Sequence, residues 1–95
     1  MSPGKATESE TTMSEFIVQT AAANMPSSCK GIYRRVAVLE VEDGVTSVKM
    51  ISPRARGVVR VVATWEKCHA KGENTAFSRA LADAREMAAE LNTQA

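Results

Sequence analysis

Residues 32–52 read IYRRVAVLEVEDGVTSVKMIS, and this stretch decides the fold. The segment 32–42 is rich in β-branched and aromatic side chains, which is typical of a β-strand. Asp43 and Gly44 follow, and this dipeptide favours a two-residue type I′ turn because both residues tolerate a positive φ. Residues 45–52 then return as a second strand, so the stretch predicts a β-hairpin.

A two-residue loop fixes the register of this hairpin and places Leu39 opposite Val48. One face of the hairpin then carries the apolar side chains of Ala37, Leu39, Val41, Val48 and Met50. We expect this face to be the core, since side chains alternate across a strand. The other face is mixed, and on it Glu40 lies diagonal to Lys49, near enough for a weak ion pair.

Residues 58–66, VVRVVATWE, predict a third strand, and residues 75–91 predict an amphipathic helix. Its apolar stripe recurs at spacings of three and four residues and consists of Phe77, Leu81, Ala84, Ala88 and Leu91. Asn74 or Thr75 is expected to cap the first turn, because either side chain can accept from an early helical N–H. The helix is expected to pack onto Leu39, Val48, Val61 and Trp65.

This order predicts a single α+β domain over residues 13–95, a three-stranded antiparallel sheet in β-β-β-α order with one C-terminal amphipathic helix packed on one face. Residues 1–12, MSPGKATESETT, are small and polar, and we expect them to form a disordered tail. Residues 15–23, EFIVQTAAA, leave strand and helix open, because the first part favours a strand and the alanines favour a helix. Residues 24–29, NMPSSC, predict a turn or loop.

The chain has 95 residues and a formal net charge of +1. Residues 1–16 lack the apolar run of a signal peptide, and no stretch approaches the roughly 18 apolar residues of a membrane span. We therefore expect a cytoplasmic protein without a membrane partner. In that compartment Cys29 and Cys68 would be reduced thiols.

Cys68 and His69 are the first residues to consider for catalysis. A thiolate–imidazole pair needs the two side chains to converge, whereas neighbours in an extended segment point in opposite directions. Structural zinc sites use close cysteine pairs, and Cys29 and Cys68 are too far apart in sequence to form one. The sequence therefore predicts neither an enzyme nor a metal or cofactor site.

Arginines form the strongest local pattern, because residues 30–60 carry seven Lys or Arg against three Asp or Glu. With the hairpin register above, five of them should gather at one end of the sheet: Arg34, Arg35, Arg54, Arg56 and Arg60. Guanidinium groups suit bidentate contacts to phosphate or to an acidic protein surface. The cluster is thus a candidate partner-binding site, and the alternative is a solvated rim that keeps the sheet soluble.

Residues 72–80, GENTAFSRA, superficially resemble the entry into the last helix of the double-stranded-RNA-binding domain. The predicted strand–strand–strand–helix order is also similar to the C-terminal part of that domain. The paired lysines with which that family grips phosphate are absent, and Phe77 and Ser78 stand near their place. The resemblance therefore implies the topology and not the family's activity.

Taken together, these patterns predict a small non-catalytic regulatory or adaptor protein that acts by binding another, unknown protein. An open three-stranded sheet has edges whose unpaired backbone groups can pair with a partner strand or with a second copy, giving a homodimer. The alternative is a nucleic-acid-binding module that uses the arginine-rich end. The chain has only 4% aromatic residues, which leaves few side chains for stacking on bases.

Overall fold

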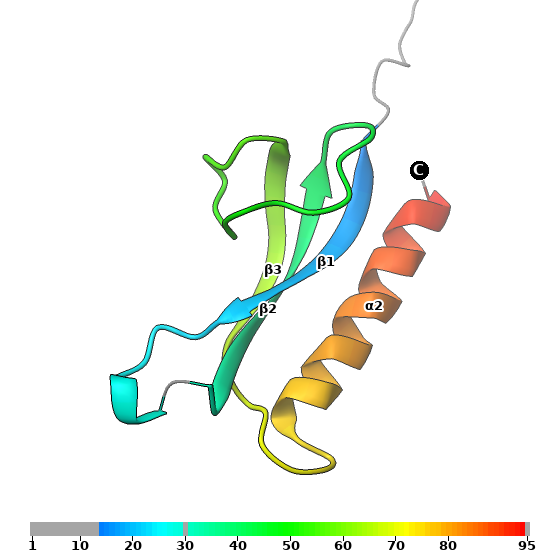
Figure 1. Ribbon diagram of the computed structural model, residues 1–95. Helices are drawn as coiled ribbons and strands as arrows, with labels where there is room; N and C mark the ends of the chain where they lie inside the picture. The colour runs from blue at the N-terminus through cyan, green and yellow to red at the C-terminus, as the bar shows by residue number, and fades with distance from the viewer. Residues whose placement is uncertain (1–13, 30, 95) are drawn as a thin grey trace, which may run out of the picture.

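The computed structural model describes residues 14–29 and 31–94, and its elements form one sheet with one long helix across it (Figure 1). In chain order they are β1 (Glu15–Ala22), the 3-10 turn η1 (Ser27–Cys29), β2 (Tyr33–Val41), β3 (Val58–His69) and α2 (Ala76–Gln94). The sheet has the order β1-β2-β3, and both pairs of strands are antiparallel. The predicted α+β class and β-β-β-α order are confirmed, while the predicted tail lies outside the described residues.

The ambiguous segment 15–23 forms a strand over Glu15–Ala22. β1 pairs with β2 over eight consecutive residues, from Glu15 opposite Val41 to Ala22 opposite Arg34. The two alanines at its end have a low strand propensity, but pairing with a neighbouring strand overrides such local preferences. β1 rather than residues 45–52 is therefore the first partner of β2.

The predicted hairpin is wrong, although its turn forms. The Val45 amide donates to the Glu42 carbonyl over 3.0 Å, which closes a two-residue turn at Asp43 and Gly44. Of these two residues only Gly44 has a positive φ, at 88°, which is the pattern of a type II turn and not of type I′. A type II turn splays the strands that flank it, so the chain leaves the sheet. The Glu42 amide instead donates to the Gly57 carbonyl over 2.9 Å.

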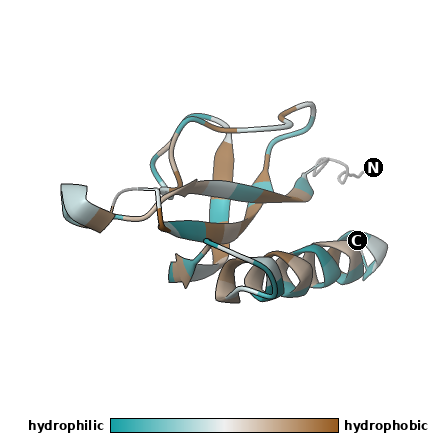
Figure 2. Cartoon of the chain, turned by 60° about the horizontal axis from the view of Figure 1, so that its bottom comes forward, coloured by the Kyte–Doolittle hydropathy of each residue, from teal (hydrophilic) through white to brown (hydrophobic). Residues whose placement is uncertain are grey.

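Residues 42–57 form a long connection that folds over one face of the sheet, and β3 takes the place beside β2 (Figure 2). The connection and the start of β3 cover a cluster of fully buried side chains on β2, namely Ala37, Leu39 and Val41. The covering side chains include Val45, Val48 and Ile51. The predicted apolar face therefore is a core, but a loop and not the helix lies on it.

The helix packs on the opposite face of β2, which corrects the predicted contact with Leu39, Val48 and Val61. The helix-side core contains Val36 and Val38 of β2 together with Cys68 and three helical alanines, Ala80, Ala84 and Ala88. Alanine side chains are short, so this face of α2 lies close to the strands. Phe77, Leu81 and Leu91 pack at the margin of this core, as the apolar stripe predicted.

A bulge in β3 explains why strict alternation misplaced part of that strand. Val38 pairs with Ala63 while the next residue, Leu39, pairs with Val61, so Val62 is an extra residue. An extra residue reverses the alternation of side chains beyond it. Val61 consequently lies in the loop-side core and Trp65 in the helix-side core.

The start of α2 follows the predicted capping chemistry. Of the two candidate residues, Thr75 is the cap, because its Oγ1 accepts from the Ser78 amide over 3.1 Å. Asn74 precedes it with a φ of 52°, a left-handed conformation that asparagine tolerates better than most residues. The helix then continues to Gln94, three residues beyond its predicted end.

Replacing the fully buried Ala84 with Leu should lower the free energy of unfolding by about 1–3 kcal/mol, because the space between α2 and β2 is already filled. Ala82 lies on the exposed side of the same helix, so Ala82→Leu is the matched control and should change stability by less than about 0.5 kcal/mol. Urea unfolding of both variants measures the difference. Equal stabilities would contradict the orientation of the helix.

Gly44 and Gly57 both have a φ of +88°, so an alanine at either position should destabilise the fold by about 1–2 kcal/mol. At Gly57 the new Cβ would also meet Val45 Cγ2 at 3.1 Å, whereas nothing lies within 4 Å of a Cβ at Gly44. We therefore expect the larger loss for Gly57→Ala in thermal unfolding. The opposite order would mean that Val45 does not pack against the end of the connection.

Candidate functional site

The two outer strands of the sheet present very different edges. β1 pairs with β2 in an unbroken register, and its residues 16–22, FIVQTAA, carry no charge. The pairing of β3 is shifted at three places, and this strand carries Arg60, Glu66 and Lys67. Bulges and charged side chains are common protections against strand pairing. The edge of β1 largely lacks them, so it is the candidate site.

Hydrogen bonds show which backbone groups of β1 face this edge. The Phe16 amide donates to Asn92 Oδ1, and Asn92 Nδ2 donates to the Phe16 carbonyl, both over 2.9 Å. The backbone groups of Phe16 thus point away from β2. Because these directions alternate along a strand, the N–H and C=O groups of Val18 and Thr20 point to the same free edge.

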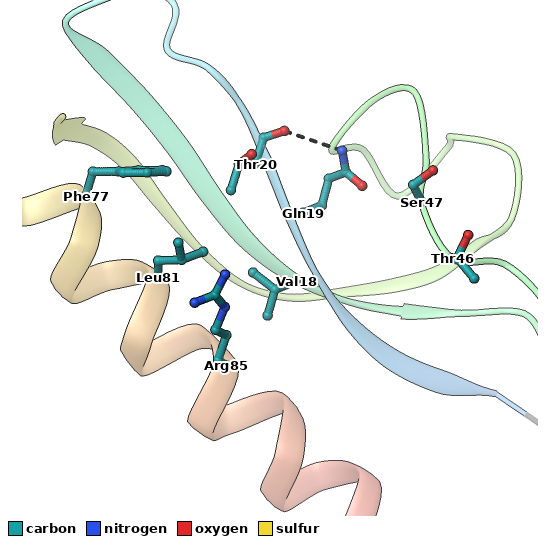
Figure 3. A pocket seen from close by; sticks show the side chains of 8 residues that line it. All are labelled: Val18, Gln19, Thr20, Thr46, Ser47, Phe77, Leu81 and Arg85. Atoms are coloured by element: carbon teal, nitrogen blue, oxygen red, sulfur yellow. Dashed lines mark hydrogen bonds between the residues drawn. The ribbon is translucent and has the colours of Figure 1, made fainter.

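A groove of about 370 Å³ runs along this edge (Figure 3). Its floor is β1 at Val18, Gln19 and Thr20, one wall is the helix, and the other wall is the connection between β2 and β3. The helical wall consists of Phe77, Leu81 and Arg85, and the wall formed by the connection consists of Thr46 and Ser47. The groove therefore joins outward backbone groups of β1 to a polar wall and to a helical wall that is apolar at Phe77 and Leu81 and charged at Arg85.

The polar wall is tied to the strand by the side chain of Gln19. The Val48 amide donates to Gln19 Oε1 over 3.2 Å, which fixes the connection above the strand. Gln19 Nε2 donates weakly to the Thr20 carbonyl over 3.4 Å. This position of the connection keeps Thr46 and Ser47 beside the edge instead of across it.

The helical wall is held by Arg34, which lies at the opposite end of the groove from Asn92. Its guanidinium carbon lies 5.7 Å from the centre of the Phe77 ring, a cation–π contact, and its Nη2 donates to Thr20 Oγ1 over 3.4 Å. Arg34 thus orders two residues that line the groove. It is a member of the predicted arginine set, but its guanidinium is used within the fold.

The structure does not bring the five predicted arginines together at one end of the sheet. Arg34 and Arg35 lie at the start of β2, whereas Arg60 lies opposite Glu40 near its end. Glu40 is six residues along the strand from Arg34, which is about 20 Å. The predicted cluster is therefore wrong as a geometric unit, and a partner-binding role for these arginines stays a prediction.

Glu40 shows how one of these arginines is used. Arg60 Nε donates to Glu40 Oε1 over 3.1 Å, and Ser14 Oγ donates to Glu40 Oε2 over 2.7 Å. The predicted pair between Glu40 and Lys49 is therefore wrong, because Lys49 lies in the connection and not in a strand beside β2. Arg35 is half-buried, and its Nε has no hydrogen-bond partner among the described residues.

The remaining two predicted arginines, Arg54 and Arg56, line a second cavity of about 760 Å³ within the connection. This cavity is open and has an apolar side to which Met50 contributes, with 63% of its surface exposed. All of its lining residues belong to the connection, from Glu42 after β2 to Gly57 before β3. It offers no row of unpaired strand backbone, so we regard the β1 edge as the better site.

Cys68 and His69 do not form a converging pair. Cys68 is buried in the helix-side core, and its Sγ lies 3.8 Å from the Trp65 carbonyl. His69 is exposed and packs edge-on against the Tyr33 ring, with 5.5 Å between the ring centres. Burial of the thiol and, to a smaller degree, the negative charge of Glu66 raise the pKa of Cys68. A thiol in this environment is protonated at neutral pH and is a weak nucleophile.

The part of the chain that the structure describes lacks two further features. No group of three or more His, Cys, Asp or Glu side chains is placed there so that it could hold a metal ion. The described residues also contain no helix that is long and apolar enough to cross a membrane. Comparison of the chain with protein-family models, curated proteins and solved structures finds no match.

Sequence reasoning anticipated a binding edge but missed the residues that shape it. Gln19, Ser47, Arg85 and Asn92 come from three distant segments, and their meeting depends on where the connection and the helix pack. One signal was present in the sequence, namely the uncharged run 16–22. A strand of that composition at the edge of a sheet is unusual unless its edge is covered or used.

The two cysteines should react very differently with a thiol reagent. Cys29 is half-exposed and should be modified rapidly in the folded protein, whereas Cys68 should react only as the protein unfolds. The raised pKa of Cys68 also means that the folded state holds this proton more tightly than the unfolded state does. The free energy of unfolding should therefore fall as the pH rises above the ordinary thiol value of about 8.5.

Urea unfolding between pH 7 and pH 10 tests this pH dependence, with Cys68→Ala as the comparison. The variant should lose the part of the pH dependence that comes from the thiol, while other groups that titrate in this range remain in both proteins. Rapid modification of Cys68 in the folded protein would contradict its place in the core.

Proposed function

We propose that this chain is a non-catalytic adaptor that binds another protein by adding an extended segment of that protein to β1. In this mode, backbone hydrogen bonds supply affinity, and pockets for alternate side chains supply specificity. The observation that carries the proposal is the groove at Val18 and Thr20, where outward backbone groups lie between two walls. We also propose that the protein works in the cytoplasm.

The geometry of the groove supports an added strand more than a compact ligand. Its floor is a segment of strand, and its walls stand on both faces of the sheet, where the side chains of a fourth strand would point. Antiparallel addition would extend a sheet that is already antiparallel throughout. The apolar wall of Phe77 and Leu81 would bury one side chain of the added strand.

The nucleic-acid alternative depends on a single arginine cluster, and no specific observation now favours it. The arginines are distributed over both ends of β2 and over the connection. A second copy of the chain remains a competing occupant of the same edge, because two β1 strands could pair with each other. The experiment below separates the two occupants.

The proposal is tested by panning a random decapeptide display library against the full 95-residue chain and measuring the affinity of selected peptides. Thr20→Pro removes an outward N–H without breaking the pairing of β1 with β2, so the fold should survive. Loss of one backbone hydrogen bond and the bulk of the ring should weaken peptide binding by about tenfold or more. Isothermal titration calorimetry measures this change.

Thr64→Pro is the matched control. Thr64 is a residue of β3 that lies opposite Ala37 of β2, and its backbone groups point to the other edge of the sheet. Its affinity for the selected peptides should match that of the unmodified chain. Peptides that bind equally well to Thr20→Pro would overturn the assignment to β1. Sedimentation that shows a dimer of the chain, converted to a monomer by Thr20→Pro, would identify a second copy as the occupant.

A further inference from the structure

We infer that the β1 groove selects an antiparallel segment with an apolar residue followed two positions later by Asp or Glu. This inference rests on the proposed function and names the chemistry of the partner. The apolar side chain would lie opposite Thr20, between Phe77 and Leu81. The carboxylate would lie opposite Val18 and pair with Arg85.

The face on which these two partner side chains lie follows from the packing of β1. Phe16 and Val18 pack in the helix-side core, whereas Ile17 packs in the loop-side core. In an antiparallel pair, residues directly opposite each other point to the same face of the sheet. Partner residues opposite Val18 and Thr20 therefore point toward α2, and the residue between them points toward Thr46 and Ser47.

The order along the groove follows from contacts at its two ends. Asn92, near the end of α2, bonds the backbone of Phe16, near the start of β1. At the other end, Arg34 contacts both Phe77 and Thr20. The helix thus runs antiparallel to β1 beside the groove, so Phe77 lies level with Thr20, and Arg85 comes after Leu81 in the direction of Phe16.

Arg85 has no acidic partner among the residues that the structure describes. Its neighbours one helical turn away are Leu81, Ala82, Ala88 and Ala89, none of which is acidic. Within residues 14–29 and 31–94, no carboxylate lies within ion-pair distance of it. Figure 3 shows the Arg85 side chain extending from α2 toward Val18.

The charge of the groove is therefore complementary to an acidic residue at one position. Arg85 is the one charged residue among the described residues that line the cavity, and it lies at the Val18 end. The Thr20 end is apolar on its helical side. A partner segment gains most when its acidic side chain and its apolar side chain are separated by one residue that faces the polar wall.

Asn92 fixes the register of the added segment. Its carboxamide satisfies both outward backbone groups of Phe16, as an added strand would otherwise do. An incoming segment can therefore form its hydrogen-bonded pairs at Val18 and Thr20 and not at Phe16. The acidic residue of the segment therefore lies opposite Val18, beside Arg85, and not opposite Phe16.

The test uses the peptides selected from the decapeptide library. We expect the selected peptides to be enriched in apolar–any–acidic sequences, read from the N-terminus. We expect Arg85→Glu to lower the affinity for such a peptide by about 3- to 10-fold, because repulsion replaces an exposed ion pair. Exchanging the acidic residue of the peptide for Lys should restore affinity for Arg85→Glu. Arg79→Glu reverses a charge on the same helix outside the groove and should leave both affinities unchanged.

The outcomes separate this inference from the proposed function. Peptides that lose affinity for Thr20→Pro but respond equally to Arg85→Glu and Arg79→Glu would overturn the acidic preference while strand addition to β1 stands. Enrichment of the reverse order, acidic–any–apolar, would overturn the antiparallel direction. Peptides insensitive to Thr20→Pro would overturn the proposed function itself.

Discussion

The burial of β2 on both of its faces is the constraint on which the rest of the structure depends. Residues 36–39 are four consecutive positions with no exposed surface, so the strand needs a cover on each side and a hydrogen-bonding neighbour on each edge. The helix supplies one cover and residues 42–57 supply the other, while β1 and β3 supply the neighbours. A central strand covered in this way leaves two outer strands with one free edge each, and function has to be sought there.

Local sequence patterns predicted most of the strands and the helix better than they predicted which segments pair or pack with each other. Residues 32–42 and 75–91 carried clear strand and helix patterns, and the Thr75 cap followed from side-chain chemistry. The hairpin failed because the Asp43-Gly44 turn adopts a geometry that splays its flanks, and because the twelve residues of β3 offer a longer pairing partner. Residues 45–52 have enough apolar side chains for a strand, yet they cover the sheet. A pattern of apolar residues in the sequence does not reveal whether a segment pairs within the sheet as a strand or packs over one of its faces.

The candidate site was less predictable than the fold, because it is assembled from segments far apart in sequence. Counting arginines between residues 30 and 60 predicted one cluster, but the register of β3 and the path of the connection place these residues apart. The groove instead combines a plain strand with Arg85 and Asn92 of the helix, neither of which is distinctive in sequence. The bulge at Val62 likewise has no local signal, although it decides which face Trp65 joins.

The two edges of the sheet show how one domain can bind a strand without pairing indefinitely. On β3, shifted registers and charged residues oppose addition along the whole strand. On β1 the protection is local, because Asn92 occupies the backbone groups of Phe16, whereas among the described residues those of Val18 have no partner and those of Thr20 meet only the long 3.4 Å contact from Gln19 Nε2 to the carbonyl. A fully open edge would accept long strands and repeated copies, whereas a fully blocked edge would accept nothing. An edge closed at one end and flanked by walls limits an added segment to a few residues, so its side chains, and not its length, decide which segment binds.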